Sequence, residues 1–351
     1  MAKTTAEATE TEWRALYDAA DELKALAPWE WMLDSDLFAV RDPESGQIGY
    51  CCVMGNLSEH YALAVYLGAD GLRGYREVAS GAYEERPAEA LFAQRCLMVS
   101  FEDRELLDKD SYAQIKALGR KYRGRQAWPE LRDYTPGYLP WRLEPSQVRF
   151  LTVAIQQTCD VARRFRDDEE YLVGPDEGQM LLRERQGGEW KESWHRPELA
   201  TPAASEPPPP VDELRLKRLS GRRLKRLGVW EADRLLFPGA VQGEKGGRPY
   251  YPPTLLIVDS ASGMVLPPMI SEPGAWRQAF QGHLLDLCEQ MDGAPREIRL
   301  RDEALAALLA PIADALKVRL RRSAALPTLE DAREGLLEAM GLAGPDAMDV
   351  P

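Results

Sequence analysis

The feature that most constrains the fold is a proline- and alanine-rich segment, RPELATPAASEPPPPVDE, at residues 196–213. It contains almost no large apolar side chains, so it cannot bury a core, and such segments behave as extended, semi-rigid spacers. The chain has 351 residues, which is more than one typical domain contains. We therefore expect two domains, residues 1–195 and residues 214–345, joined by this linker.

The residues before the linker predict an α+β domain. Apolar residues recur at helical spacing over residues 11–26 and over residues 144–168. Apolar runs separated by turn residues predict a pair of strands over residues 37–55 and a hairpin over residues 179–195. The stretch WPELRDYTPGYLPWRL, residues 128–143, is aromatic and interrupted by proline, so we expect an ordered loop there.

The residues after the linker predict a second α+β domain, built on a mixed sheet. A basic helical stretch, LRLKRLSGRRLKRLG, covers residues 214–228. The later elements are predicted in the order βββαβαβα, with a hairpin over residues 254–270 whose turn is DSASG. A strand, a helix and a second strand follow over residues 297–322, and Gly341 is placed to cap the last helix.

The composition argues against several classes of protein. The first residues, MAKTTAEATETEW, are polar and acidic, unlike a signal peptide, and no apolar run approaches the roughly 20 residues that span a bilayer. The five cysteines show no CxxC spacing and the three histidines are far apart, so the sequence predicts neither a disulfide framework nor a zinc site. We expect a cytoplasmic protein with no cofactor and no membrane partner.

The net charge of −13 is unevenly distributed. The first 212 residues contain 25 basic and 38 acidic side chains, and the remainder contains 19 of each. Nucleic-acid binding needs a basic surface, so it is not expected in the first domain. In the second domain, Arg222, Arg223, Lys225 and Arg226 crowd one short segment. This segment can bind nucleic acid or an unknown protein partner, dock on the acidic first domain, or form a solvated helix face.

The element order of the second domain, with Asp302 closing the fourth strand, resembles the ribonuclease H-like fold of nucleases, integrases and transposases. The resemblance covers roughly residues 228–341. The two halves together resemble an uncharacterised bacterial two-domain family, on the segments WEWMLDSDLF, GYCCVMGNLSEHYALAVYLGADGL and RPYYPPTLLIVDSASG. The resemblance to that family implies the two-domain architecture and leaves the function open.

A ribonuclease H-type enzyme places acids on the first strand, the first helix, the end of the fourth strand and the last helix, where they bind two Mg²⁺ or Mn²⁺ ions. Asp302 fits the end of the fourth strand, and Asp233 fits the first strand. The helical candidates are Asp286, Glu289, Glu330 and Asp331. Capping a helix N-terminus also explains an acid at Asp302, and we expect Asp302 to have that role without a working metal centre.

No P-loop, dinucleotide fingerprint or nucleophile elbow is present in the sequence. Four aromatic residues of the expected loop, Trp128, Tyr134, Tyr138 and Trp141, can line a ligand groove or an interface, or pack in the core. The favoured hypothesis is a non-enzymatic binding or regulatory protein. The alternative is a metal-dependent nuclease-like enzyme that uses Asp233 and Asp302.

Overall fold

The computed structural model describes residues 7–83, 90, 93–198, 207–237, 239–243 and 246–339. The chain divides into two compact units. Unit 1 comprises Met1–Pro136 and Pro140–Ala200, and unit 2 comprises Gly137–Leu139 and Thr201–Val350. Residues 199–206 of the expected linker and the expected cap at Gly341 lie outside the described residues.

Unit 1 is built on a seven-stranded sheet with the strand order β5-β4-β3-β2-β1-β6-β7. Neighbouring strands are antiparallel except β1 and β6, which are parallel. The strands are β1 (Phe38–Arg41), β2 (Ile48–Met54), β3 (Ala62–Leu67), β4 (Cys96–Glu102), β5 (Trp128–Tyr134), β6 (Met180–Gln186) and β7 (Glu189–His195). The predicted strand pair and the predicted hairpin are β1–β2 and β6–β7.

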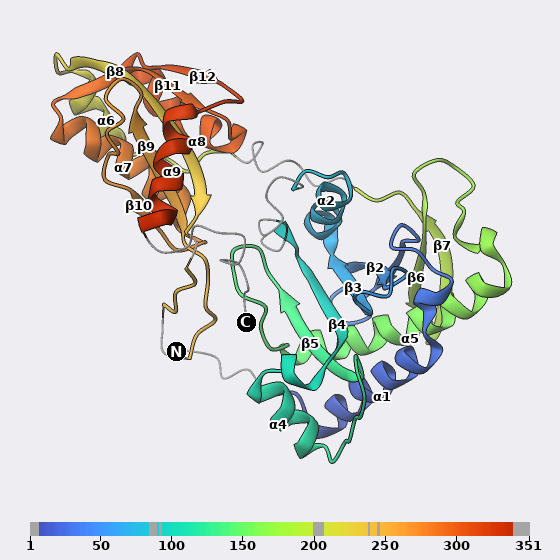
Figure 1. The fold of residues 1–351 in the computed structure, drawn as a ribbon. Coiled ribbons are helices and arrows are strands. Elements are labelled where there is room, and N and C mark those ends of the chain that lie inside the picture. The colour runs from blue at the N-terminus through green and yellow to red at the C-terminus, as the bar shows by residue number, and fades with distance from the viewer. Residues whose placement is uncertain are drawn as a thin grey trace. The chain divides into compact units, whose positions relative to one another are not determined.

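Helices α1 (Glu10–Leu26), α4 (Lys109–Ala117) and α5 (Pro145–Asp167) cover one face of this sheet and share a core with it. Figure 1 shows α1 and α5 side by side, and the two helices pack against each other. Helix α1 begins with a capping box, in which the Thr9 hydroxyl accepts the Glu12 N–H and the Glu12 carboxylate accepts the Thr9 N–H.

Helix α2 (Gly68–Ala79) packs on the opposite face, over a core that includes Tyr66, Leu72 and Cys96. The glycines of GADGLRG allow this close packing. A Cβ atom at Gly71 would lie 2.7 Å from the Arg95 carbonyl oxygen, and one at Gly74 would lie 2.6 Å from the Ala93 carbonyl oxygen. These glycines therefore serve backbone packing.

The loop that was expected at residues 128–143 is wrong in its first half, because Trp128–Tyr134 forms strand β5 at the edge of the sheet. Its buried residues alternate with more exposed ones, and Leu131 enters the core. An edge strand tolerates a proline such as Pro129 because one of its sides needs no hydrogen-bonding partner. The alternation of buried and exposed residues is that of a strand, and the proline led to the prediction of a loop instead.

Unit 2 is built on a five-stranded mixed sheet with the strand order β10-β9-β8-β11-β12. Strand β9 is antiparallel to β8 and β10, whereas β11 is parallel to β8 and β12. The strands are β8 (Lys225–Leu236), β9 (Pro253–Asp259), β10 (Met269–Ile270), β11 (Gly293–Leu300) and β12 (Arg319–Arg322). The helices are α6 (Glu213–Ser220), α7 (Trp276–Gln290), α8 (Glu303–Leu316) and α9 (Pro327–Ala339). The α+β class and the predicted order βββαβαβα, from β8 to α9, are confirmed.

The two faces of the second sheet are covered differently. Helices α6, α7 and α8 pack on one face, around a core that includes Trp230, Ile298 and Leu305. Helix α9 packs on the other face, against β9 and β8, with Leu329 beside Leu256. The α9 contacts therefore lie on the β9–β8 side of that face, away from the edge strand β12.

The single helix expected over residues 214–228 is also wrong. Helix α6 ends at Ser220 and Gly221 follows it, while residues from Lys225 onward form the start of β8. The Lys225 N–H donates to the Asp292 carbonyl, and β8 then runs in register with β11. This distant pairing decides the conformation, because the sequence alone satisfies a helical pattern.

Candidate functional site

Asp302 caps helix α8. One carboxylate oxygen, Oδ1, accepts the backbone N–H groups of Ala304 and Leu305 at 2.8 and 3.1 Å. The other oxygen, Oδ2, accepts a hydrogen bond from Arg234 Nε at 2.9 Å. Both oxygens of the strongest sequence candidate for a metal ligand therefore have partners within the protein.

Asp233 is buried, and its Oδ2 lies 2.9 Å from Arg301 Nε. The other oxygen accepts the backbone N–H of Arg234 at 3.0 Å. Arg301 also pairs with Glu330 of α9 at 3.0 Å. Asp233 and the helical candidate Glu330 therefore share one arginine.

Each of the two acids pairs with an arginine from the other strand, Asp233 with Arg301 and Asp302 with Arg234. Asp233 and Arg234 are adjacent on β8, and Arg301 and Asp302 are adjacent at the end of β11. Successive residues of a strand point to opposite faces. The Asp233–Arg301 pair consequently lies on the α9 face, and the Arg234–Asp302 pair lies on the α8 face.

This geometry does not bring Asp233 and Asp302 to a common point. The α7 acids are occupied elsewhere, because Asp286 and Glu289 both bind Arg215 of α6. The hydrogen bond from Arg215 lowers the pKa of Glu289. Over the residues that the structure describes, no group of three or more His, Cys, Asp or Glu side chains is arranged to hold a metal ion. The predicted acids therefore do not fit the Mg²⁺ or Mn²⁺ centre of the alternative hypothesis.

A further acid on β8, Glu231, was not singled out from the sequence. Its side chain is 1% exposed, and its Oε2 accepts the Leu329 N–H at 2.9 Å, in the first turn of α9. Its Oε1 accepts the Ser260 hydroxyl at 3.3 Å. A carboxylate is favourable at a helix N-terminus, so Glu231 holds α9 on the sheet.

The four basic residues singled out from the sequence do not form one free patch. Arg222 pairs with Asp292, and Arg226 Nη1 donates to the Leu316 carbonyl at 3.0 Å, at the end of α8. Arg223 and Lys225 are exposed and make no ion pair with any described residue. Two of the four cations thus have structural roles, and two remain available.

The strand register gathers a different set of cations on the α9 face, next to the part that α9 covers. Arg299 of β11 lies beside Arg321 of β12, and Glu297 lies beside Arg319. Lys225 of β8 points to the same face of the sheet, because side chains alternate between the two faces along a strand. We call this set of four cations, Lys225, Arg299, Arg319 and Arg321, the basic face.

The register places the buried Glu231 of β8 opposite Arg299, and the acid that lies among the cations themselves is Glu297 of β11. Its carboxylate lies 3.0 Å from Arg299 Nε and 3.9 Å from Arg319 Nη1. The Arg319 side chain is 79% exposed, and Arg321 makes no ion pair with a described residue. The basic face therefore carries an excess of positive charge. The alternation KVRLR at residues 317–321 was the sequence signal for it, because cations at every second strand position share one face.

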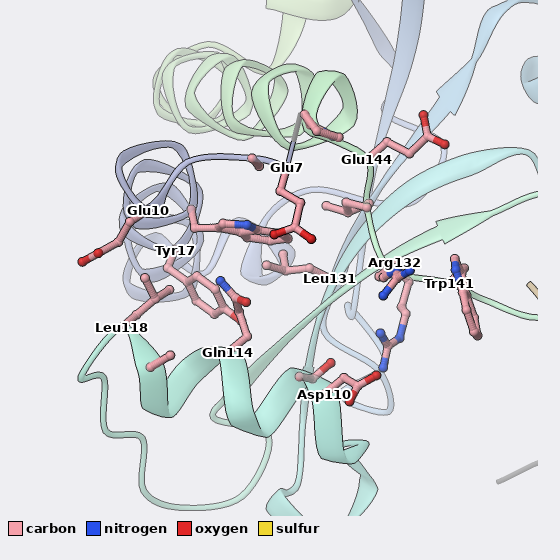
Figure 2. A pocket seen from close by; sticks show the side chains of 17 residues that line it. Glu7, Glu10, Tyr17, Asp110, Gln114, Leu118, Leu131, Arg132, Trp141 and Glu144 are labelled. Atoms are coloured by element: carbon pink, nitrogen blue, oxygen red, sulfur yellow. The ribbon is translucent and has the colours of Figure 1, made fainter. Parts of the chain in front are cut away.

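Unit 1 contains an open groove of about 840 Å³ between α1, α4, β5 and the start of α5. Figure 2 shows Glu10 and Leu118 on one side of it, and Arg132, Trp141 and Glu144 on the other. Arg132 is already paired with Asp108 and Glu130. The lining carries both signs of charge, so it does not define a class of ligand.

The four aromatic residues of the expected loop separate in the structure. Trp128 packs against Tyr112 and Tyr122, and Tyr134 packs against the core beneath α2. Tyr138 belongs to unit 2, where its ring lies 6.0 Å from that of Tyr250. Trp141 lines the groove of unit 1. Core packing accounts for the first two, and the four do not form one surface.

Comparison with known proteins finds two domain families in the chain. Residues 13–183 match a domain of unknown function, DUF7309, and residues 215–337 match a second domain of unknown function, DUF6930. No curated protein and no solved structure matches the chain. Within the described residues, no helix is both long enough and apolar enough to cross a membrane. The expected membership of an uncharacterised two-domain family is confirmed, since the chain joins a DUF7309 domain to a DUF6930 domain.

Proposed function

We propose that this protein binds nucleic acid non-covalently through the basic face of unit 2. The observation that carries the proposal is the pair Arg319 and Arg321 on edge strand β12, next to Arg299, with Glu297 as the acid among them. Phosphate groups would supply the missing negative charge, and arginine binds them with a planar set of donors.

Charge pairing elsewhere in unit 2 supports this choice. Arg215, Arg222 and Arg234 each have a carboxylate within 2.9 Å. Arg321 and Lys225 make no ion pair with any described residue, and neither do the exposed Lys217, Arg218 and Arg223. The basic face differs from these in that Arg299 and Arg321 lie side by side on neighbouring strands, with Arg319 on the same strand as Arg321. Such a surface attracts polyanions even when the net charge of the chain is negative, because screening limits the repulsion from distant charges.

The resemblance of the element order to ribonuclease H-like nucleases, integrases and transposases favours nucleic acid over an acidic protein as the partner. The proposed activity is binding without cleavage. Arginines rather than free carboxylates surround Asp233 and Asp302, so no metal-activated water is part of the proposal.

The test compares two double variants of the full chain. Arg319→Ala with Arg321→Ala removes two charges from the basic face. Lys217→Ala with Arg218→Ala removes two exposed charges from α6, which packs with α7 and α8 over the other face of the sheet. Fluorescence anisotropy with labelled single-stranded and duplex oligonucleotides measures the affinity of each variant from about 50 to 200 mM salt, because phosphate contacts are salt-dependent over that range.

With about four phosphate contacts, the logarithm of the association constant should fall with the logarithm of the salt concentration with a slope of about −3.6 for duplex DNA. The Arg319/Arg321 variant should reduce the size of that slope by about 1.8, whereas the α6 variant should leave it unchanged. Binding should be unaffected by EDTA. Equal binding by the two variants would refute the proposal. Absence of binding at low salt would also refute it, and would leave the arginines as protection of an edge strand against pairing.

A further inference from the structure

A second open groove in unit 1, called the cavity below, is lined by charged side chains of one sign only. Its volume is about 690 Å³, within the range of small-molecule sites. Four aromatic side chains line it, namely Trp29, Trp31, Tyr61 and Phe165. Three carboxylates, Glu30, Asp36 and Glu169, also line it, and its lining residues include no lysine, arginine or histidine.

The carboxylates of this cavity are not neutralised within the described chain. The side chains of Glu30 and Glu169 are exposed and form no ion pair or hydrogen bond with any described residue. Asp36 accepts the Leu33 N–H at 2.8 Å and pairs with no described cation. On the neighbouring surface of unit 1, by contrast, Arg163 pairs with Glu22 at 2.6 Å. The lining of the cavity therefore carries a net negative charge, which attracts a cation.

The aromatic rings are held in place and already contact a cation. The Trp31 indole N–H donates to the Ala162 carbonyl at 3.0 Å, and the Trp29 and Tyr61 rings lie 4.9 Å apart. The Lys24 ammonium lies 5.1 Å from the centre of the Trp29 ring and 4.5 Å from that of Tyr61. Arg166 Cζ lies 5.4 Å from the centre of the Trp31 ring. Neither Lys24 nor Arg166 lines the cavity, and their contacts show that these rings accept a cation.

We infer that this cavity binds a small organic cation with an alkylated ammonium group. Aromatic faces attract such a group through their quadrupole, and they favour it over a metal ion because they offer no lone pairs. The carboxylates add long-range attraction, and the volume matches a free small molecule. This inference is independent of nucleic-acid binding by unit 2.

Choline and its neutral carbon isostere, 3,3-dimethylbutan-1-ol, are the probes. Isothermal titration calorimetry on the full chain should detect choline binding in the millimolar range, after subtraction of a sodium chloride titration of equal ionic strength. The neutral isostere should bind at least about tenfold more weakly, because it has the shape of choline without its charge.

Variants separate the two kinds of contact. Glu30→Gln with Glu169→Gln should weaken choline binding about three- to tenfold, since each exposed charge contributes modestly. The matched control, Glu105→Gln with Glu177→Gln, removes two exposed acids that do not line the cavity, and should have no effect. Phe165→Leu keeps an apolar wall but removes the ring, so it should weaken choline binding about two- to fivefold and leave the isostere unchanged.

Three results would overturn the inference. The first is no heat beyond the sodium chloride control up to about 50 mM choline, a concentration well above the millimolar range expected for a weak site. The second is equal affinity for choline and the isostere, and the third is equal choline binding by the two double variants. Circular dichroism of each variant checks that it has folded, and Glu30→Gln with Glu169→Gln changes only exposed side chains.

Discussion

Replacing Asp302 tests whether this acid holds structure or a metal ion. Its Oδ1 accepts two backbone N–H groups of α8, and its Oδ2 accepts Arg234 Nε. Loss of an N-terminal cap destabilises a protein by about 1 kcal/mol, within a range of about 0.5–2. The ion pair adds about 0.5 kcal/mol, since the Arg234 side chain is 36% exposed and solvent screens it. Asp302→Ala should therefore cost about 1.5 kcal/mol of unit 2 stability.

Asp302→Asn separates the two contributions, because asparagine caps helices about as well as aspartate. It removes the charge and should cost about 0.5–1 kcal/mol, from the ion pair and the helix dipole. A double-mutant cycle of Asp302→Asn with Arg234→Gln should give a coupling of about 0.5 kcal/mol. Glu303→Gln is the matched control. That acid starts the same helix, but its pair with Arg322 is exposed on both sides. Its cost should be about 0.5 kcal/mol, mainly from the helix dipole, and so well below that of Asp302→Ala.

Hydrogen–deuterium exchange of the α8 amides, followed by mass spectrometry on the full chain, measures these free energies without separating the two units. The capping argument fails if Asp302→Ala costs no more than Glu303→Gln. It also fails if Asp302→Asn removes a Mg²⁺- or Mn²⁺-dependent activity from the protein, because a structural cap would leave any such activity intact.

Three further predictions concern single residues. The Ser262 N–H holds the pKa of Asp259 below the ordinary value of an aspartate, so this turn should lose stability as the pH falls from about 5 through the folded-state pKa. Chemical denaturation across that range should show a weaker pH dependence for Asp259→Asn. Gly55→Ala should destabilise unit 1 by about 1–3 kcal/mol in urea unfolding, because Gly55 has a φ of +128° and a new Cβ would lie 2.6 Å from Tyr61 Cδ1. Burial raises the pKa of the Cys51 thiol to about 12, so it should react with a thiol reagent only after denaturation, and rapid modification of the folded chain would contradict its buried position.

The elements that depend on short-range interactions could be predicted from the sequence. The periodicity of α1 and α5, the apolar runs of β1 and β2, and the glycine turn between β6 and β7 each depend on neighbours within a few residues. Gly187 and Gly188 both have positive φ angles in that turn, a conformation that glycine adopts without steric cost. The element order of unit 2 followed from the same kind of signal, because hydrophobic period and turn residues are local properties.

Long-range pairing decided the rest. Whether residues 225–228 join a helix or a strand depends on β11, which lies far along the chain. The partners of Arg234 and Arg226 are 68 and 90 residues away, so the sequence could not show which cations are neutralised. For the same reason it indicated Asp233 and Asp302 as a pair, although strand alternation turns them to opposite faces. The sequence determined where charged residues occur, and only the tertiary structure determined which of them remain free to bind, because each charge is paired or left exposed by strands that meet through folding.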